Sequence, residues 1–429
     1  MAVAALSGSS RPAAFPRVLG LALLALRASE ACPTPLPPAQ RWSGMRYRCA
    51  SGSSCEVPAG EHWLLDAGMD VQTLTVKGCL RWDVDQDGLE LRAGYILVDD
   101  DGYFEVGTAA APMIKQATIY LKQGAQHTSW GTRFLWGQGN SRVEIHGRAL
   151  GRSWTLLAQT AAAGATMLHL KHNAQSMGWR VGDTIGLATT SRNPTRPYTI
   201  TAVRPSGAVE VQPPLADEHM GGMRRISLTG AGGSFDRHFE LAAEVVNLQR
   251  SVVITGEPNW DTPSREGLHT GMHSSGYMDI RYARVENCGQ PPNLGRYCLH
   301  FHHMHQCPRC VFQGNAVVNG TQVGITIHGT HRALVDRNVL WNTASVGVYI
   351  EDGNEMNNTI SDNAIVCMHR VPPDAINPNK PAEHCQRDLF DEPGRLGGIF
   401  AIGMTNHIIG NRIVNMENGM WFKGSADPH

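Results

Sequence analysis

The chain has 429 residues, of which 46 are glycine and 17% are charged, and its formal net charge is −1. A composition rich in glycine and poor in charge is typical of a turn-rich β protein, and the length allows two or three domains. Because the near-zero net charge provides no broad positive field, we exclude a nucleic-acid partner.

The N-terminus has the features of a secretory signal peptide, which we place at residues 1–31. Arg11 and Arg17 supply its positive region, Val18–Leu26 its apolar stretch, and Ser29-Glu30-Ala31 a cleavage site. The apolar stretch is far shorter than the about 20 residues that span a bilayer, and no other segment is long and apolar enough. We therefore expect a secreted or cell-surface protein. Membrane association through a partner or an uncleaved signal anchor is the alternative.

Ten cysteines are an even number, which favours disulfides in an exported chain. Cys49 with Cys55 and Cys367 with Cys385 are spaced for local loops, although the full pairing stays open. Cys307-Pro308-Arg309-Cys310 has the spacing of a redox or zinc motif, and in an exported chain we expect it to form a disulfide. Two N-glycosylation sequons also agree with export: Asn319-Gly320-Thr321 and Asn357-Asn358-Thr359.

Short alternating strands between turn residues fill the first half of the mature chain. Residues 32–125 form the first predicted β domain, with strands near 71–76, 80–84, 89–91, 95–98 and 103–106. Residues 126–257 form a β-rich connecting region, with strands near 143–146, 166–170, 184–187, 200–203, 209–211 and 252–255. No helical period competes with this pattern, so the chain is predicted to be all-β.

Four asparagines recur in similar short phrases in the last third of the chain. Asn315, Asn338, Asn363 and Asn411 follow one another at intervals of 23, 25 and 48 residues. A fixed period in the twenties marks stacked coils that bury their apolar faces against one another. We predict a right-handed parallel β-helix over 258–429, interrupted by an insertion at 367–396 that is rich in proline, asparagine and charge.

A histidine-rich strand is the first candidate for chemistry. In Leu299-His300-Phe301-His302-His303-Met304-His305, alternation predicts that His300 and His302 share one face and that His303 and His305 share the other. Stacking of the coils predicts further neighbours. His328 lies 13 residues after Asn315 and Glu351 lies 13 residues after Asn338, so the two occupy equivalent positions on successive coils.

These residues predict a column about 4.8 Å apart from coil to coil. His302, His328 and either Glu351 or Asp352 would line it. Histidine beside carboxylate suits general acid–base cleavage of a glycosidic bond, and it equally suits a metal site. An inert, hydrogen-bonded histidine ladder is the structural alternative. Our candidate catalytic residues are His300, His302, His328, Glu351 and Asp352.

Three basic residues on the same coils are candidates for binding an acidic polymer: Arg296, His331 and Arg332. The segment Asp83-Val84-Asp85-Gln86-Asp87-Gly88 begins like an EF-hand loop. Its twelfth position is Gly94, where that loop requires a glutamate, so we reject it as an EF-hand and keep a weaker Ca²⁺ site as the alternative.

The strand phrases resemble a known combination of extracellular modules. The segments that resemble the G8 domain are Gly78–Trp82, Leu89–Val98 and Phe104–Thr108. The segments that resemble the β-helix of the cell-migration-inducing and cell-surface hyaluronidases are Leu299–His302, Ile327–Thr330 and Tyr349–Gly353. The resemblance covers residues 45–425, and fibrocystin and its relatives share the architecture.

The resemblance implies an extracellular protein that binds and depolymerises hyaluronan, with Ca²⁺ as the only expected cofactor. In the fibrocystin branch it implies instead a non-catalytic receptor or matrix-binding module. Whether the chain is an enzyme of the glycoside hydrolase type therefore stays open at this point, as do the bond cleaved and the oligomeric state.

Overall fold

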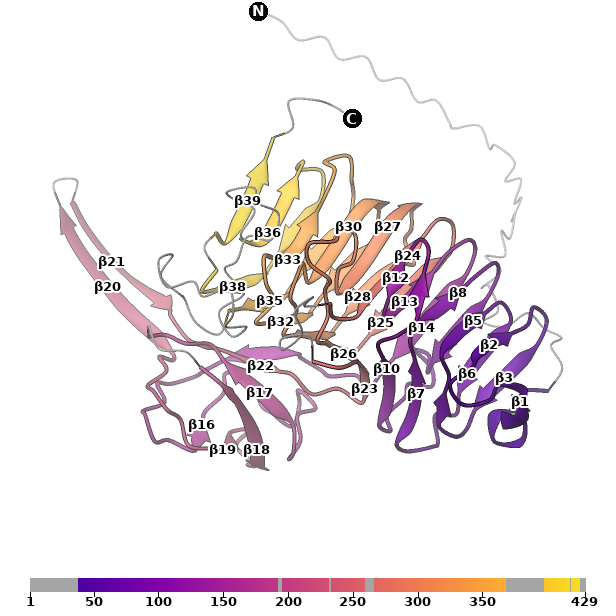
Figure 1. Ribbon diagram of the computed structural model, residues 1–429. Coiled ribbons are helices and arrows are strands. Elements are labelled where there is room, and N and C mark those ends of the chain that lie inside the picture. The colour runs from indigo at the N-terminus through magenta and orange to yellow at the C-terminus, as the bar shows by residue number, and fades with distance from the viewer. Residues whose placement is uncertain are drawn as a thin grey trace, which may run out of the picture.

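The computed structural model describes an all-β chain, as predicted, and contains no α-helix in its described part (Figure 1). Two short 3₁₀ helices, η1 (Trp42–Gly44) and η2 (Arg46–Arg48), lie near the N-terminal end of the stack. No helix in the described part is long and apolar enough to cross a membrane. The described residues are 38–191, 195–230, 233–258, 266–367, 397–416 and 418–424.

Three long sheets, each built from successive coils of the chain, make up most of the fold. We call these sheets A, B and C. Each coil contributes a strand to sheet B, then to sheet A, then to sheet C, so neighbouring strands within each sheet run parallel. Sheet A contains β1 (Gln40–Arg41), β3 (His62–Leu65), β6 (Cys79–Trp82), β9 (Tyr103–Val106), β14 (Arg142–His146), β25 (Tyr277–Arg281), β28 (Val311–Gln313), β31 (Leu334–Asp336), β34 (Thr359–Ser361) and β37 (His407–Ile409).

The other two sheets complete each coil. Sheet B contains β2 (Ser54–Val57), β5 (Thr73–Val76), β8 (Ile96–Val98), β13 (Phe134–Gly137), β24 (His269–His273), β27 (Leu299–Gln306), β30 (Ile325–His331), β33 (Val346–Ile350), β36 (Gly397–Ile402) and β39 (Met420–Lys423). Sheet C contains β4 (Met69–Asp70), β7 (Leu89–Ala93), β10 (Ala117–Leu121), β23 (Val252–Thr255), β26 (Ala283–Glu286), β29 (Ala316–Val318), β32 (Val339–Trp341), β35 (Ala364–Val366) and β38 (Arg412–Val414).

The coil stack is not confined to the segment 258–429 for which the sequence predicted it. Strand β10 lies between β7 and β23 in register, and β14 lies between β9 and β25, so the N-terminal coils continue directly into the C-terminal ones. The region expected to connect two domains therefore contributes β13 and β14 to the stack itself. Figure 1 shows one continuous row of strands.

A separate antiparallel module leaves the stack between β14 and β23. Its strands are β15 (Trp154–Leu156), β16 (Met167–Leu168), β17 (Thr184–Leu187), β18 (Pro197–Val203), β19 (Val209–Gln212) and β22 (Glu244–Asn247). A long hairpin, β20 (Met223–Gly230) with β21 (Gly233–Glu240), projects from this module (Figure 1). A second small hairpin, β11 (Gln126–His127) with β12 (Gly131–Thr132), precedes β13.

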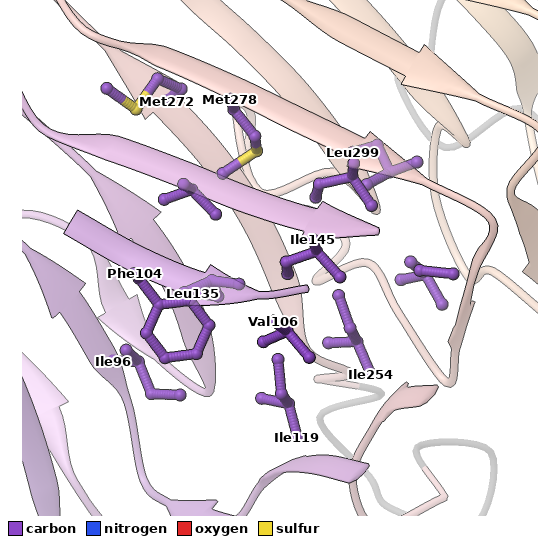
Figure 2. Close-up of a cluster of buried hydrophobic side chains, with 14 of the residues drawn as sticks. Ile96, Phe104, Val106, Ile119, Leu135, Ile145, Ile254, Met272, Met278 and Leu299 are labelled. Atoms are coloured by element: carbon purple, nitrogen blue, oxygen red, sulfur yellow. The ribbon is translucent and has the colours of Figure 1, made fainter. Parts of the chain in front are cut away.

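Alternating apolar side chains fill the interior of the coils. Phe104, Ile145, Ile254 and Leu299 come from three coils and from all three sheets, and each is fully buried (Figure 2). Burial of such a side chain contributes about 1.5–3 kcal/mol. The alternate positions on the same strands therefore face outward, which is how sheet B presents its histidines.

The asparagine ladder forms as predicted, at the corner between sheets A and C. The side-chain carbonyl of Asn338 accepts a 2.9 Å hydrogen bond from the backbone N–H of Asn315, and Asn363 does the same for Asn338. Each side-chain amide donates to a carbonyl of the previous coil, such as Phe312 for Asn338. The ladder therefore satisfies buried backbone groups at every turn. Asn358 and Asn406 form a second ladder that the sequence analysis missed.

The predicted disulfides Cys49–Cys55 and Cys307–Cys310 are present, and Cys288 bonds Cys298. Cys79 and Cys367 are also disulfide-bonded. The signal peptide, Cys32, Cys385 and almost all of the predicted insertion at 367–396 lie outside the described residues.

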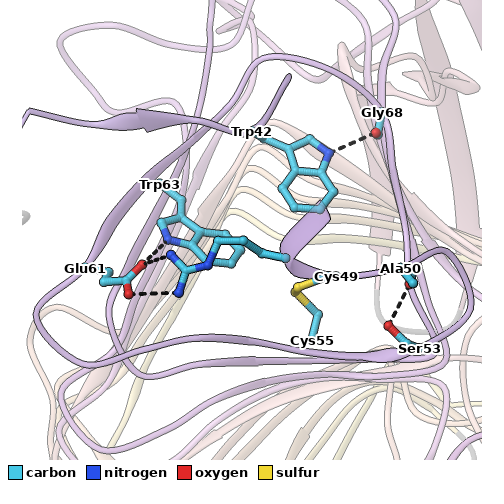
Figure 3. Close-up of a disulfide and its surroundings, with 9 residues drawn as sticks. Trp42, Cys49, Ala50, Ser53, Cys55, Glu61, Trp63 and Gly68 are labelled. Atoms are coloured by element: carbon cyan, nitrogen blue, oxygen red, sulfur yellow. Dashed lines mark hydrogen bonds and ion pairs between the residues drawn. A yellow bond between two sulfur atoms is a disulfide. The ribbon is translucent and has the colours of Figure 1, made fainter. Parts of the chain in front are cut away.

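The first of these disulfides lies at the N-terminal end of the stack, beside two tryptophans (Figure 3). Trp42 stacks on Trp63 with ring centroids 6.0 Å apart, and the Trp42 indole donates to the carbonyl of Gly68. Glu61 accepts hydrogen bonds from Trp63 and from the guanidinium of Arg48. These contacts cover the first coils of the core.

Candidate functional site

The histidines converge on the outer face of sheet B, where strands β24, β27 and β30 lie side by side. In this register His273 pairs with His302 and His302 pairs with His328. The intervening residues Phe301 and Ile327 are fully buried and point into the coil. Strand alternation therefore places His302 and His328 on one outward column, as the sequence analysis expected.

An imidazole–carboxylate row runs across three successive coils at this point. His302 Nδ1 lies 3.1 Å from His328 Nδ1, and His328 Nε2 lies 3.0 Å from an oxygen of Asp352. Glu351 brings a carboxylate oxygen to 3.5 Å from His328 Nδ1. A carboxylate only accepts hydrogen bonds, so His328 donates from Nε2 and keeps a lone pair on Nδ1. In the His302–His328 contact, His302 Nδ1 is therefore the donor and His328 Nδ1 is the acceptor.

His300 lies behind this row and is completely buried. Its ring stacks parallel to that of His328 with centroids 6.1 Å apart, and its centroid lies 4.9 Å from that of His302. Nδ1 bonds the backbone carbonyl of Gly295 at 2.9 Å, so this nitrogen carries the proton. The buried Nε2 has no hydrogen-bond partner in the described part of the chain.

A β-bulge corrects one prediction about this strand. The register shifts between His302 and His305, and both His303 and His305 have a positive φ near 53°. The bulge breaks the alternation, so the His303 ring lies 4.5 Å from His302 and 4.0 Å from His328 instead of on the opposite face. His305 is exposed.

Burial keeps the imidazoles of His300, His302 and His328 uncharged near neutral pH. It lowers the pKa of His302 to about 3, and it lowers the pKa of His300 well below its usual value. Burial also lowers the pKa of His328, against the opposing effect of the nearby Asp352 carboxylate. The cluster thus presents neutral nitrogens rather than positive charge.

Glu355 holds the carboxylate loop in place, and the sequence analysis did not select it. This buried side chain accepts hydrogen bonds from the backbone N–H groups of Gly329, Asp352 and Gly353 at 2.8–3.0 Å. Its only signal in the sequence is its position two residues beyond an Asp-Gly turn. Glu355 therefore fixes the loop that follows β33, which carries the carboxylates of Glu351 and Asp352.

A pocket of about 240 Å³ opens beside His300 and His302. Trp130 and Trp136 stack with centroids 4.2 Å apart and form one wall, and Arg296 lies on another. Arg296 bonds the side chain of Gln290 at 3.1 Å and makes no ion pair within the described residues. The pocket therefore combines an aromatic wall, a guanidinium without a carboxylate partner and the edge of the histidine cluster.

His331, the last residue of β30, and Arg332, which follows it at the corner, are not among the residues that line this pocket. His331 Nδ1 accepts a 3.2 Å hydrogen bond from the backbone of Met356, and Arg332 is exposed. The structure thus brings together Arg296 and the five candidate catalytic residues, and it leaves the other two basic candidates at the coil edge.

A second group on sheet A was not predicted. Glu144, His146 and Asp279 place their polar atoms within 4.8 Å of one another. Arg281 binds both oxygens of Asp279, at 2.7 and 2.9 Å. The carboxylates at positions 83, 85 and 87 do not form such a group in the described chain, where Asp87 instead accepts from the backbone of Gln116.

Comparison with known proteins divides the chain into two matched parts. The G8 domain family matches residues 41–158, and the CEMIP beta-helix family matches residues 265–429. Fibrocystin-L of Homo sapiens is 27% identical over 392 residues, a match that covers 78% of this chain and 9% of the relative. Protein rliB of Dictyostelium discoideum is 26% identical and covers 70% of this chain and 25% of the relative.

The chain therefore spans a quarter or less of the length of these relatives. Among solved structures, the tailspike protein gp49 from Pseudomonas phage LKA1 is 12% identical, covers 76% of this chain and 52% of the tailspike chain, and has a TM-score of 0.19.

Proposed function

The chain belongs to the proteins that join a G8 domain to a CEMIP-type β-helix, and on this premise we propose that it binds and depolymerises a uronic-acid glycan of the hyaluronan class outside the cell. The observation that carries the proposal is the row Asp352–His328–His302 beside a pocket lined by the Arg296 guanidinium, which makes no ion pair within the described residues. The disulfides are typical of an oxidising, extracellular setting.

The pocket supports binding of a polyanionic sugar chain. Trp130 and Trp136 offer flat apolar surface against which a sugar ring can pack, and Arg296 can pair with a uronate carboxylate in a planar, two-point contact. The pocket is smaller than a typical site for a whole small molecule. It suits one segment of a longer ligand that continues along the face of sheet B.

The adjacent cluster supports cleavage of the bound chain. Hydrolysis of a glycosidic bond needs a group that protonates the leaving oxygen and a group that activates water. Asp352 orients His328, His328 contacts His302, and His302 lines the pocket. Glu351 adds a second carboxylate beside His328. The cluster therefore supplies groups that can exchange protons next to the bound sugar.

The direct test is cleavage of high-molecular-mass hyaluronan by the purified, secreted chain, followed by size-exclusion chromatography with light scattering. We expect shorter products from the parent protein, and a loss of at least about 100-fold in rate for H302A and D352N, the loss typical of removing an acid–base group. H305A changes an exposed histidine on the same strand and is the matched control.

Parallel reactions with added Ca²⁺ and with a chelator test the calcium dependence that the resemblance implies. Parent activity in both H302A and D352N would show that the site is elsewhere. Tight hyaluronan binding without any cleavage by the parent protein would support the alternative, a non-catalytic matrix-binding module like that expected for the fibrocystin branch.

A further inference from the structure

His300 and His302 of strand β27 and His328 of strand β30 bring their ring nitrogens together. One ring nitrogen from each of His300, His302 and His328 lies within 4.8 Å of the other two. We propose that these three residues bind a transition-metal ion of the Zn²⁺ class. Imidazole nitrogen is a preferred ligand for such ions, whereas Ca²⁺ and Mg²⁺ prefer oxygen.

The spacing of the two closest nitrogens fits a shared ion. Ligand atoms of a tetrahedral zinc centre lie about 3.3 Å apart when the metal–nitrogen bonds are 2.0–2.1 Å long, as they are in zinc proteins. His302 Nδ1 and His328 Nδ1 are 3.1 Å apart. Glu351 also brings a carboxylate oxygen to 3.5 Å from His328 Nδ1.

The outer contacts of the histidines match those of metal ligands. A ligand imidazole usually donates its other N–H to a carbonyl or a carboxylate, which fixes the tautomer and aims the lone pair. His300 makes this bond with the carbonyl of Gly295, and His328 makes it with Asp352. For His302 to be a ligand through Nδ1, its proton would have to lie on Nε2, which would leave the Nδ1 lone pairs of His302 and His328 available to the ion.

His300 provides a second, independent indication. Its side chain is completely buried, and its Nε2 has no hydrogen-bond partner in the described chain. A buried acceptor without a partner lowers stability. A bound ion would satisfy this nitrogen within a cluster that already has two more nitrogen ligands.

Two other groups compete less well. His303, His328 and Asp352 also converge, but that set uses the carboxylate that already orients His328, and it leaves His300 Nε2 unsatisfied. Glu144, His146 and Asp279 on sheet A include a carboxylate whose two oxygens are both held by Arg281. A guanidinium at that place repels a cation.

Metal binding stands apart from the proposed function. Only the use of the ion in glycan cleavage rests on that function, in which the ion would lower the pKa of a bound water and so generate the attacking hydroxide. Binding is therefore measured without any glycan present.

The experiment uses the chain secreted from cells without a polyhistidine tag. Plasma mass spectrometry of the purified protein measures its metal content. After chelation, titration calorimetry with Zn²⁺ and absorption spectroscopy with Co²⁺ measure rebinding. We expect one ion per chain, a tetrahedral Co²⁺ spectrum and no competition from Ca²⁺.

The variants separate this site from its competitors. H302A and H300A should each weaken Zn²⁺ binding by at least 100-fold, D352N by 10–100-fold, as is typical for an outer-shell group, and H305A and H303A should retain it. H302Q provides a milder change if an alanine variant fails to fold, which circular dichroism reports.

Loss of binding in H303A with retention in H300A would overturn the assignment, and so would parent-like binding in both H300A and H302A. Metal binding without hyaluronan cleavage would leave this site in place and count against the proposed function. Full cleavage by metal-free protein would keep that function and remove the ion from it.

Discussion

Glu355 and Gly329 are 26 residues apart in sequence, and the carboxylate of Glu355 accepts a 2.9 Å hydrogen bond from the backbone N–H of Gly329 on the preceding coil. The same carboxylate accepts from Asp352 and Gly353. One buried side chain thus ties the end of β30 to the loop that carries Asp352. The position of the candidate catalytic carboxylate of Asp352 therefore depends on this bond as well as on the sheet.

We therefore expect E355Q to impair cleavage without removing any reacting group. Glutamine replaces one acceptor oxygen by a donor NH₂, which faces a backbone N–H and loses at least one of the three hydrogen bonds. A displaced loop should lower the hyaluronan cleavage rate by about 10–100-fold, while hyaluronan binding is retained. E218Q, which changes an exposed glutamate, is the control. Unchanged turnover in E355Q would contradict the positioning role.

Arg296 provides a second prediction, for substrate affinity. If its guanidinium pairs with a uronate carboxylate, R296Q should weaken hyaluronan binding by about tenfold or more, the effect of one charge-assisted contact. The affinity of a neutral chitin oligosaccharide should not change. Surface plasmon resonance with both ligands measures the difference. R237Q, on the exposed hairpin strand β21, controls for lost net charge, and equal losses in the two variants would remove Arg296 from the site.

The same assay tests how far the bound chain extends. R332Q changes the exposed corner after β30. A loss of affinity in R332Q would extend the groove to this corner, as the sequence analysis proposed. Parent-like affinity would limit it to the pocket.

The fold could be predicted where one physical constraint repeats along the chain. Asn315, Asn338 and Asn363 each satisfy buried backbone groups at the same corner, so these C-terminal coils carry the same residue and the period becomes visible. That period also gave the pairing of His328 with Glu351. The N-terminal coils have no such ladder, and their loops differ in length, so the continuity of the stack through β10 and β14 was not visible.

The site was predicted only as far as strand alternation holds. His302 and His328 pair in the predicted register. The bulge at His303 depends on its backbone conformation, which no local residue pattern predicts. The pocket wall comes from Trp130 and Arg296, which lie far apart in sequence in segments of irregular length. The repeat spacing predicts neighbours only within the repeating strands, so it did not predict that Trp130 and Arg296 line the same pocket.

The asparagine ladder gives a prediction about stability. Asn338 is fully buried, accepts from the backbone of Asn315 and donates to the carbonyl of Phe312. N338A leaves both groups without partners inside the stack, at a cost of about 1–3 kcal/mol each. We expect a destabilisation of about 2–5 kcal/mol by urea unfolding. N354A, at an exposed loop position, should change stability by less than about 0.5 kcal/mol. Equal urea midpoints for N338A and the parent protein would contradict the proposed contribution of the asparagine ladder to stability.

His219 gives a prediction about pH. It is buried in the antiparallel module, and its Nδ1 bonds the carbonyl of Ala188 at 2.8 Å. Burial lowers its pKa below the usual 6.5, against smaller opposing effects of the hydrogen bond to Ala188 and of Asp217. The unfolded chain therefore binds this proton before the folded chain does, so its contribution to stability is complete above pH 6.5 and is lost as the pH falls through the folded pKa.

The measurement is the urea midpoint at pH 7.5 and at pH 5.5 for the parent protein and for H219Q. Glutamine does not titrate and can still donate to Ala188, so the drop in midpoint between the two pH values should be smaller in the variant. Other buried histidines, such as His269, are present in both proteins and cancel in this difference. An identical drop in the two proteins would mean that His219 does not carry the acid sensitivity, because its proton would then bind the folded and unfolded chains equally.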